Sequence, residues 1–259
     1  MVRCEYFAGT ARCPWWRDLV TKLVSDTAML MAAGLGKRMR PLTATTPKPL
    51  VRVLGKPLID RALDRVEDAG IEKAVVNVHY LAESIEAHLG PRKCPAVQFS
   101  DEREELLETG GGMVKARAAD LLPDPFFACN ADSIWLDGPR NAFEELSDAW
   151  DPERMDALLL VVTHARARNF DGSGDFYMDG LGKLTRKLPG RIAPFIYTGI
   201  QLVSHRLLRD APEGKFSTNI LWDRAIEEGR LFGIAFTGTW YEVGTPQHIR
   251  PTEEALTGG

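Results

Sequence analysis

Short apolar runs and helically spaced apolar residues follow one another through the first 163 residues. The apolar runs predict buried strands at 27–33, 74–78, 96–99, 126–130 and 157–163. Apolar residues at helical spacing predict helices at 57–69, 81–89, 113–122 and 141–150. Strands that alternate with helices form βαβ units. The pattern therefore predicts a Rossmann-like α/β fold, with a mostly parallel sheet covered by helices.

The pattern changes after residue 163, where turns and short strands replace the alternation. We expect a hairpin around Asp179-Gly180, a strand at 195–203, a helix at 217–228 and a closing pair of strands at 231–236 and 239–243. This mixed, β-rich part is expected to pack against the same sheet. Because no linker or repeat interrupts the chain, we predict one domain over 27–256 with two halves, 27–163 and 164–256. Residues 1–26 carry no interpretable motif and form an N-terminal extension of unknown role.

Composition narrows the class of protein. The 259 residues carry 32 Lys and Arg against 36 Asp and Glu, and 44% are hydrophobic. This apolar content excludes a disordered chain, and the mild negative charge argues against a nucleic-acid partner. Residues 27–59 depart from the average, because they hold six basic residues and no acidic one. Such a segment concentrates an anionic ligand locally, although charge alone leaves a solvated basic loop as an alternative.

Targeting signals are lacking in the sequence. No apolar run is long enough to span a membrane, and no secretory signal is recognisable. The four cysteines include no C-x-x-C pair, so a zinc or redox site is not expected. These features predict a cytoplasmic protein with reduced thiols and no membrane partner.

A glycine-rich loop follows the first predicted strand, and the segment from Met31 reads MAAGLGKRMRPLTATTPKPLVRV. A Walker loop is excluded because Lys37 is followed by Arg38 instead of Ser or Thr. A dinucleotide fingerprint is excluded because Met39 stands where its third glycine belongs. The loop therefore needs another interpretation.

Small residues and fixed cations suit this loop to a nucleotide polyphosphate. Backbone amides can approach a nucleotide closely at four small residues, Ala32, Ala33, Gly34 and Gly36. The guanidinium of Arg38, beside Lys37, can donate two parallel hydrogen bonds to a polyphosphate. Lys48 lies between Pro47 and Pro49, which stiffen its backbone. We predict that these residues bind the nucleotide and that Arg38 and Lys48 take part in catalysis.

The loop closely resembles the signature A-A-G-x-G-x-R-x-x-P-L-T…P-K-P-L of the sugar-1-phosphate nucleotidylyltransferases, and the resemblance extends from about residue 27 to 256. Four further strings carry a closer match: LETGGGMVKA, NADSIW, GDFYMDG and FSTNILWDRAI. The resemblance implies a nucleotide-binding half (27–163) and a sugar-binding half (164–256). It also implies uridylyl transfer from UTP to N-acetylmuramate 1-phosphate, in peptidoglycan recycling, with Mg²⁺ as cofactor.

The three glycines at 110–112 precede a predicted helix, whose N-terminus adds a positive end. Such a loop allows backbone contact with a flat base and ribose. The resemblance implies that it borders the uracil pocket, with Glu108, Gly110 and Gly111 as nucleotide contacts.

Two carboxylates are the candidate Mg²⁺ ligands. Asp132 follows the buried strand at 126–130, and ligands bind at such strand ends in this fold. The family uses the equivalent aspartate for metal and catalysis. Glu242, in WYEVGTP, stands where the family usually has Asp, and its longer side chain requires a shifted metal or backbone.

The remaining candidates lie on the sugar side. The resemblance assigns Asn130 and Asp175 to sugar contacts, and we expect Tyr197, Thr198 and Asn219 to line the same side. Lys187 is a candidate for the sugar phosphate, although the usual E-K-P spelling of the family is absent.

Alternatives remain open at this point. The same chemistry could serve glucose 1-phosphate or mannose 1-phosphate, and Glu242 leaves room for a nucleotide-sugar-binding protein without turnover. The sequence also leaves monomer and dimer open.

Overall fold

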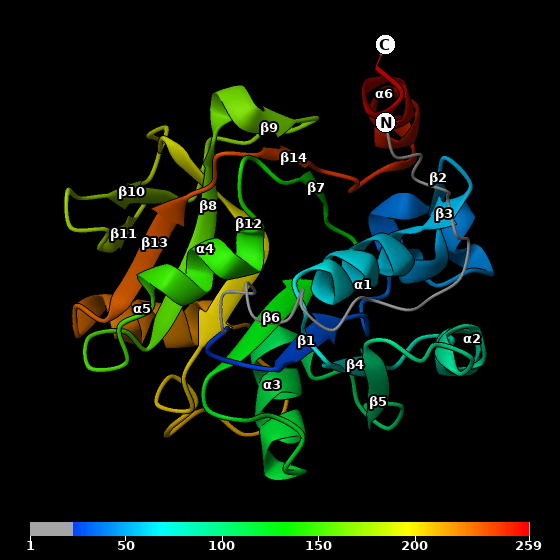
Figure 1. Cartoon of the computed structure of the whole chain (residues 1–259), viewed down its shortest axis with the longest axis horizontal. Coiled ribbons are helices and arrows are strands. Elements are labelled where there is room, and N and C mark those ends of the chain that lie inside the picture. The colour runs from blue at the N-terminus through cyan, green and yellow to red at the C-terminus, as the bar shows by residue number, and fades with distance from the viewer. Residues whose placement is uncertain (1–22, 259) are drawn as a thin grey trace, which may run out of the picture.

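The computed structural model describes residues 23–258, so most of the predicted N-terminal extension lies outside the described residues. Parallel strands form the centre of the main sheet in the order β6, β1, β4 and β5 (Figure 1). Their bounds are β1 (Thr27–Met31), β4 (Lys73–Val78), β5 (Ala96–Asp101) and β6 (Phe126–Asn130). The predicted strands before residue 163 are confirmed, and the α/β fold with a largely parallel sheet is confirmed with them.

The chain beyond residue 163 adds strands to the same sheet. The long strand β12 (Phe195–Val203) lies antiparallel between β6 and β8 (Ala157–Thr163). On its other edge, β8 pairs in parallel with β13 (Leu231–Ala235). The predicted hairpin consists of β10 (Phe176–Met178) and β11 (Leu184–Arg186), and it extends the sheet beyond β12. The two parts of the chain therefore share one continuous sheet.

The predicted closing strand pair is wrong. Strand β13 joins the main sheet, whereas β14 joins a separate three-stranded sheet. That sheet is composed of β7 (Ile134–Leu136), β14 (Thr239–Tyr241) and β9 (Ala167–Arg168). The chain turns away between the two strands at Gly238, where a Cβ would lie 2.1 Å from the carbonyl oxygen of Leu136. This close approach to β7 directs β14 to a partner outside the main sheet.

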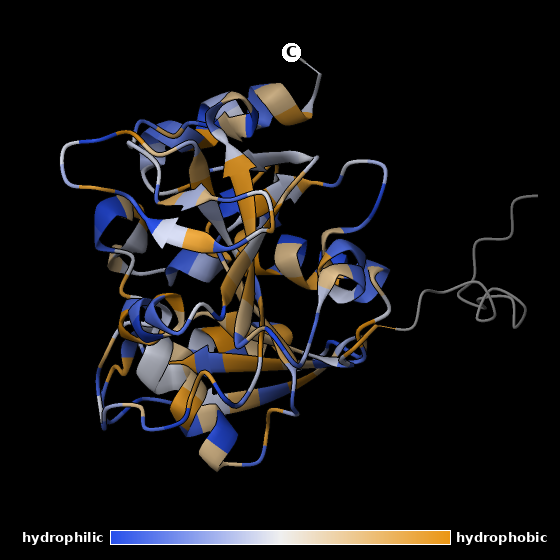
Figure 2. Cartoon of the chain, turned by 90° about the vertical axis from the view of Figure 1, so that its left-hand side faces the viewer, coloured by the Kyte–Doolittle hydropathy of each residue, from blue (hydrophilic) through white to orange (hydrophobic). Residues whose placement is uncertain are grey.

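Helices cover both faces of the main sheet. One face carries α1 (Leu58–Asp68), α2 (Ala82–Leu89) and α4 (Ala142–Ala149). The other carries α3 (Glu108–Ala118) and α5 (Asn219–Glu227). Figure 2 shows the hydrophobic colour gathered in the central strands, with polar colours frequent on the outer loops and helices. The strands are apolar throughout because both of their faces are covered.

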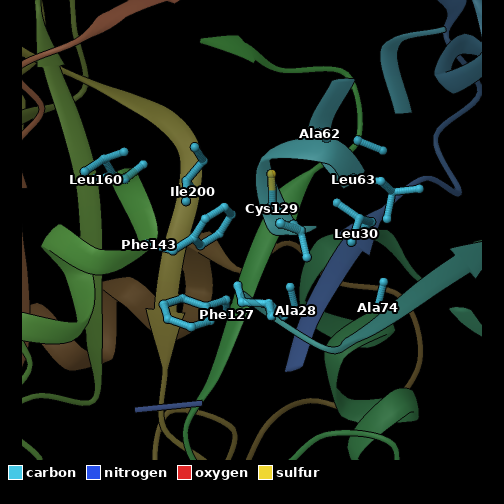
Figure 3. Packing of buried hydrophobic residues seen from close by; sticks show 14 of the residues in the cluster. Ala28, Leu30, Ala62, Leu63, Ala74, Phe127, Cys129, Phe143, Leu160 and Ile200 are labelled. Carbon is cyan, nitrogen blue, oxygen red and sulfur yellow. The ribbon is translucent and has the colours of Figure 1, made fainter. Parts of the chain in front are cut away.

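Alternate residues of each strand belong to opposite cores. From β1, Ala28 and Leu30 pack with Phe127, Leu63 and Phe143 on the face of α1 and α4 (Figure 3). Their neighbours along β1 and β6 point to the core on the α3 and α5 side. This period-two division is the geometry of a strand buried on both faces.

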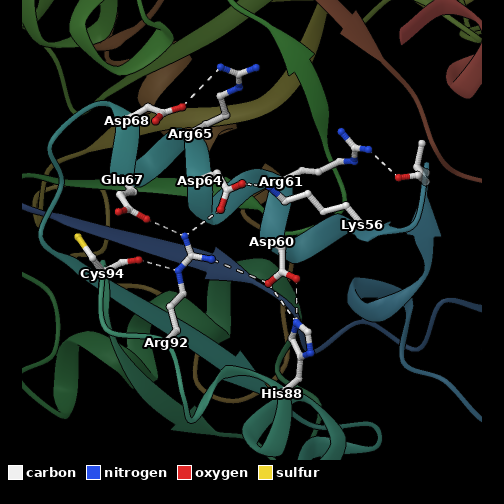
Figure 4. A network of polar contacts seen from close by, with 11 residues as sticks. Lys56, Asp60, Arg61, Asp64, Arg65, Glu67, Asp68, His88, Arg92 and Cys94 are labelled. Carbon is white, nitrogen blue, oxygen red and sulfur yellow. Dashed lines mark hydrogen bonds and ion pairs between the residues drawn. The ribbon is translucent and has the colours of Figure 1, made fainter. Parts of the chain in front are cut away.

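A polar network fastens α1 to the segment that follows α2 (Figure 4). Arg92 donates from Nη2 to Asp64 (3.0 Å) and Glu67 (3.1 Å), both on α1. His88 of α2 lies 2.9 Å from the Oδ2 of Asp60, also on α1. These contacts fix the outer helices and lie away from the cavities described below.

A third, smaller core packs the glycine-rich loop against the C-terminal part of the chain. Met39 and Val53 pack with Tyr241 and Val243, and α6 (Ile249–Leu256) covers this cluster from outside. The same region holds the short hairpin of β2 (Arg52–Val53) and β3 (Lys56–Pro57). The part of the chain after residue 163 also contains two single 3₁₀ turns, η5 (His164–Arg166) and η6 (Pro246–His248). The small core thus brings residues near 38 and 242 together.

Between residues 23 and 258, no helix is both long and apolar enough to cross a membrane.

Candidate active site

Two cavities open beside each other at the carboxyl ends of β1 and β6. The first, called here the basic cavity, has a volume of about 420 Å³ and is lined by residues 34–39, Lys48, Leu106, Glu108, Asp132, Lys215 and Gly244. The second, the aromatic cavity, has about 280 Å³ and includes Phe176, Tyr197 and Trp222 in its lining. Asn130 lines the aromatic cavity and Asp132 the basic one, so the end of β6 joins them. Ligands of open α/β sheets bind at such an edge.

Three single turns of 3₁₀ helix shape the glycine-rich loop: η2 (Lys37–Met39), η3 (Leu42–Ala44) and η4 (Lys48–Leu50). Gly36 begins the first turn in the left-handed region, with φ of 58°. A Cβ there would lie 2.9 Å from the Cβ of Lys48 and 3.0 Å from Cγ2 of Thr43. The hydroxyl of Thr43 also donates to the carbonyl of Gly36 at 2.8 Å. Glycine is therefore required, and the tight loop sets Arg38 and Lys48 over one cavity.

Asn77, at the end of β4, holds the start of the loop from beneath. Its Oδ1 accepts hydrogen bonds from the backbone amides of Ala32 (2.6 Å) and Ala33 (3.3 Å). Its Nδ2 donates to Oε1 of Glu102 at 2.7 Å, and the other oxygen of Glu102 accepts from the amide of Leu107 at 3.1 Å. Burial raises the pKa of the fully buried Glu102 carboxyl, and these two hydrogen bonds oppose that rise. The loop thus rests on a buried polar network.

Sequence reasoning missed Asn77 and Glu102. An amide inside the apolar run AVVNV was the available signal, because a buried polar side chain in a strand needs partners. The structure also shows that the amides of Ala32 and Ala33 are turned to Asn77, and neither residue lines the basic cavity. The loop reaches the cavity from Gly34 onward.

Replacing Asn77 by leucine is expected to destabilise the protein and weaken nucleotide binding together. The change leaves the two alanine amides and one oxygen of Glu102 without their buried partner. The expected loss of unfolding free energy is about 1–3 kcal/mol. Denaturant unfolding and the KM for the nucleotide test this, and an unchanged midpoint with an unchanged KM would contradict it.

Each of the two candidate metal carboxylates contacts a cation of the loop. Lys48 Nζ is hydrogen-bonded to Oδ2 of Asp132, and these side chains are 14% and 32% exposed. Arg38 Nη1 lies 3.4 Å from Oε1 of Glu242, and Arg38 remains 71% exposed. A Cβ on Gly244, which lines the basic cavity, would lie 2.9 Å from that same carboxylate oxygen. The structure therefore brings all four predicted groups to the rim of one cavity.

Asp132 and Glu242 are suited to a hard divalent cation. They present carboxylate oxygens that are partly exposed and border a cavity rich in cations. Oxygen ligands of this kind suit Mg²⁺, which usually keeps several waters and takes one or two protein carboxylates. Among residues 23–258, no cluster of three or more His, Cys, Asp or Glu side chains could hold a metal by itself. The donor set therefore fits a cation shared with a phosphate ligand better than a closed protein site.

The predicted glycine loop at 110–112 is part of a helix. Helix α3 begins at Glu108, so the predicted helix start at 113 is wrong. The amides of Gly110 and Gly111 both point to the carbonyl of Phe216, at 3.0 and 3.3 Å. Glycine is needed here because a Cβ on Gly110 would lie 2.2 Å from the Phe216 ring. Glu108 lines the basic cavity, whereas Gly110 and Gly111 line neither cavity.

Gly110→Ala is therefore expected to destabilise the protein. Because the new methyl group would overlap the Phe216 ring, α3 and the 214–216 segment must separate. Overpacking of this kind costs about 1–3 kcal/mol of unfolding free energy. Gly180→Ala is the matched control, because a Cβ there meets nothing within 4 Å. Equal unfolding midpoints for the two variants would refute the packing argument.

The aromatic cavity gathers most of the predicted sugar contacts. Asn130, Asp175, Tyr197 and Asn219 all line it, although they come from four separate segments. Oδ2 of Asp175 accepts from the backbone amide of Tyr197 at 2.9 Å, which fixes the carboxylate at the cavity wall. Thr198 is only 1% exposed, does not line either cavity, and donates its hydroxyl to the carbonyl of Leu160 at 2.8 Å. Thr198 thus faces the protein interior.

Sequence reasoning also missed Arg186, which lines the aromatic cavity from β11. The neighbouring candidate Lys187 instead donates to the hydroxyl of Ser173 at 2.6 Å and lines neither cavity. Residues one apart on a strand point to opposite faces, so the register of the hairpin decides which cation enters. No sequence motif marked Arg186.

Comparison with known proteins agrees with this geometry. The family model described as Nucleotidyl transferase matches residues 27–170. An N-acetylmuramate alpha-1-phosphate uridylyltransferase of Caulobacter vibrioides is 45% identical over 233 residues, covering 88% of this chain and 96% of that protein. A protein of the same name from Neisseria meningitidis serogroup B is 35% identical over 242 residues, covering 89% of this chain and 98% of that protein.

A solved structure extends the comparison to the fold. UDP-glucose pyrophosphorylase complexed with UDP-glucose matches with a TM-score of 0.73 and 15% identity, over 91% of this chain and 99% of that one. At this identity the likeness shows the fold alone. The same architecture thus recurs in a protein whose solved structure holds a nucleotide sugar.

Proposed function

The chain belongs to the nucleotidyl transferase family, and we propose that it transfers a uridylyl group from UTP to N-acetylmuramate 1-phosphate, giving a UDP-sugar and pyrophosphate. The names of the relatives from Caulobacter vibrioides and Neisseria meningitidis support this choice of substrates. We further propose that the reaction serves peptidoglycan recycling in the cytoplasm, where UTP is made. Residues 27–163 supply most of the nucleotide side and residues 164–256 most of the sugar side.

One observation carries the proposal: the basic cavity and the aromatic cavity meet at the end of β6. The first presents the cations Lys37, Arg38, Lys48 and Lys215, which suit a triphosphate. The second presents aromatic rings and hydrogen-bonding side chains, most of them uncharged, which suit a sugar. Two anionic substrates can therefore be held with their phosphates toward one another.

The proposed chemistry is a single in-line displacement. A phosphate oxygen of the sugar 1-phosphate attacks the α-phosphorus of UTP, and the bond from that phosphorus to the oxygen bridging the α- and β-phosphates breaks. Pyrophosphate departs with the electron pair of that bond. Because the attacking group is already an anion, the step requires no general base and no covalent enzyme intermediate. The barrier lies in bringing two polyanions together, so positioning and charge stabilisation dominate.

The two loop cations have separate tasks in this proposal. Lys48 is held at the end of β6 beside Asp132, where it can stabilise charge at the α-phosphate. Arg38 is exposed at the cavity rim and can donate two hydrogen bonds to the departing pyrophosphate. Mg²⁺ would be held by Asp132 and Glu242, and when bound it supplies charge neutralisation and orientation of the phosphates. Lys48 and Arg38 then counter the remaining negative charge.

A substrate panel tests the proposal. The purified chain is incubated with Mg²⁺, each of the four ribonucleoside triphosphates, and the 1-phosphates of N-acetylmuramate, N-acetylglucosamine, glucose and mannose. Pyrophosphate release is expected to be greatest with UTP and N-acetylmuramate 1-phosphate. A higher kcat/KM for a different pair would reassign the substrate. Tight binding of a UDP-sugar without any pyrophosphate release would instead identify a binding protein.

A further inference from the structure

Arg186 is the one cation among the described residues that line the aromatic cavity. The only other charged side chain in that lining is Asp175, whose Oδ2 accepts the backbone amide of Tyr197. The cations suited to phosphates lie in the basic cavity instead. A single arginine in a cavity whose other lining side chains, apart from Asp175, are uncharged therefore needs an explanation of its own.

The guanidinium of Arg186 is held firmly. Its Nε donates to Oδ1 of Asp223 at 2.6 Å, and its Nη2 donates to Oδ1 of Asn219 at 2.9 Å. Its central carbon lies 4.9 Å from the ring centre of Phe176 and 5.6 Å from that of Trp222. These contacts come from β10 and α5, so they fix both the position and the plane of the group.

One nitrogen remains for a ligand. Within residues 23–258, the hydrogen bonds of Arg186 use Nε and Nη2, and none uses Nη1. The guanidinium carries a full charge, and Asp223 is its one carboxylate partner there. A planar guanidinium pairs well with a carboxylate, which its N–H groups can bind with defined geometry.

We propose that Arg186 is a specificity residue that donates from Nη1 to a carboxylate carried by the sugar. This inference rests on the proposed function, because N-acetylmuramate differs from N-acetylglucosamine by a lactyl ether that ends in a carboxylate. Asp175, the one anion in the lining, would accept from hydroxyl or amide groups of the sugar. Arg186 thus selects the sugar acid, whereas the basic cavity binds the phosphates that all candidate sugars share.

The test compares two acceptors that differ only in the lactyl group. For Arg186→Gln, kcat/KM with N-acetylmuramate 1-phosphate is expected to fall roughly 10- to 100-fold, as for a lost hydrogen bond between charged groups. The value with N-acetylglucosamine 1-phosphate is expected to change by less than about threefold, because that sugar lacks the carboxylate. For Arg186→Lys, kcat/KM with N-acetylmuramate 1-phosphate should lie between the values of the wild type and of Arg186→Gln. Lysine keeps the positive charge but lacks the planar guanidinium that pairs with a carboxylate.

Arg191→Gln is the matched control, because Arg191 is exposed on the neighbouring loop and lines neither cavity. Arg191→Gln should leave kcat/KM unchanged with both acceptors. Equal losses for both acceptors in Arg186→Gln would show a structural or phosphate-binding role and overturn the inference, as would no loss with either.

A binding measurement separates this inference from the proposed reaction. Calorimetric affinities of the two sugar 1-phosphates are measured on the wild type and on Arg186→Gln, so no turnover is needed. A wild-type preference for the muramate that disappears in the variant supports Arg186 even if the chain transfers no uridylyl group. A preference that survives in the variant overturns the inference even if the reaction itself is confirmed.

Discussion

Arg38→Ala is expected to lower kcat/KM for UTP by roughly two orders of magnitude or more, as for other groups that stabilise charge in a transition state. Arg38 is 71% exposed, and within residues 23–258 its one ion-pair partner is Glu242, at 3.4 Å. Because an exposed ion pair contributes little to folding, the unfolding midpoint should hardly move. The loss should therefore appear in catalysis and not in stability.

Arg40→Ala is the matched control for Arg38. Arg40 is an exposed arginine two residues away and does not line the basic cavity. Its kcat/KM should stay near the wild-type value. A loss below tenfold in Arg38→Ala, or an equal loss in both variants, would remove Arg38 from its proposed role at the pyrophosphate.

Asp132→Asn is expected to reduce kcat by about 10²- to 10³-fold at saturating substrates. The substitution keeps the shape of the side chain but removes the negative charge beside Lys48 and weakens the candidate Mg²⁺ site. The Mg²⁺ concentration needed for half-maximal rate should rise in parallel, because asparagine is a poorer ligand for a hard cation. Initial rates over a range of Mg²⁺ concentrations measure both effects.

Asp148→Asn provides the comparison for Asp132, because it removes a carboxylate from an ion pair on the outer face of α4. Its rate and its Mg²⁺ dependence should match the wild type. If Asp132→Asn kept more than a tenth of the wild-type kcat with an unchanged Mg²⁺ requirement, Asp132 would not be the metal carboxylate.

The fold could be predicted largely because its strands are buried on both faces. Runs such as 126–130 and 157–163 are apolar from end to end, and that pattern depends only on local sequence. The start of α3 could not be predicted, because the glycines at 110–112 disfavour a helix when considered alone. Packing against Phe216, more than a hundred residues away, decides that they are helical.

In the candidate site, too, some residues could be predicted from local sequence and others could not. Arg38, Lys48 and Asp132 lie in sequence motifs, so they were predicted, and the structure brings them to one cavity. Asn77 and Arg186 act through partners distant in the chain, namely the Ala32 amide and Asp223. Strand pairing and hairpin register create those contacts, and neither is encoded by a short motif.

The most direct test of the central claim follows the α-phosphate of UTP. The chain is incubated with Mg²⁺, N-acetylmuramate 1-phosphate and UTP radiolabelled at the α-phosphate, and the products are separated. Uridylyl transfer predicts that the label appears in UDP-N-acetylmuramate, with one pyrophosphate released for each molecule formed. Label that appears only in UDP or UMP, or label that stays in UTP while the sugar binds, would contradict it.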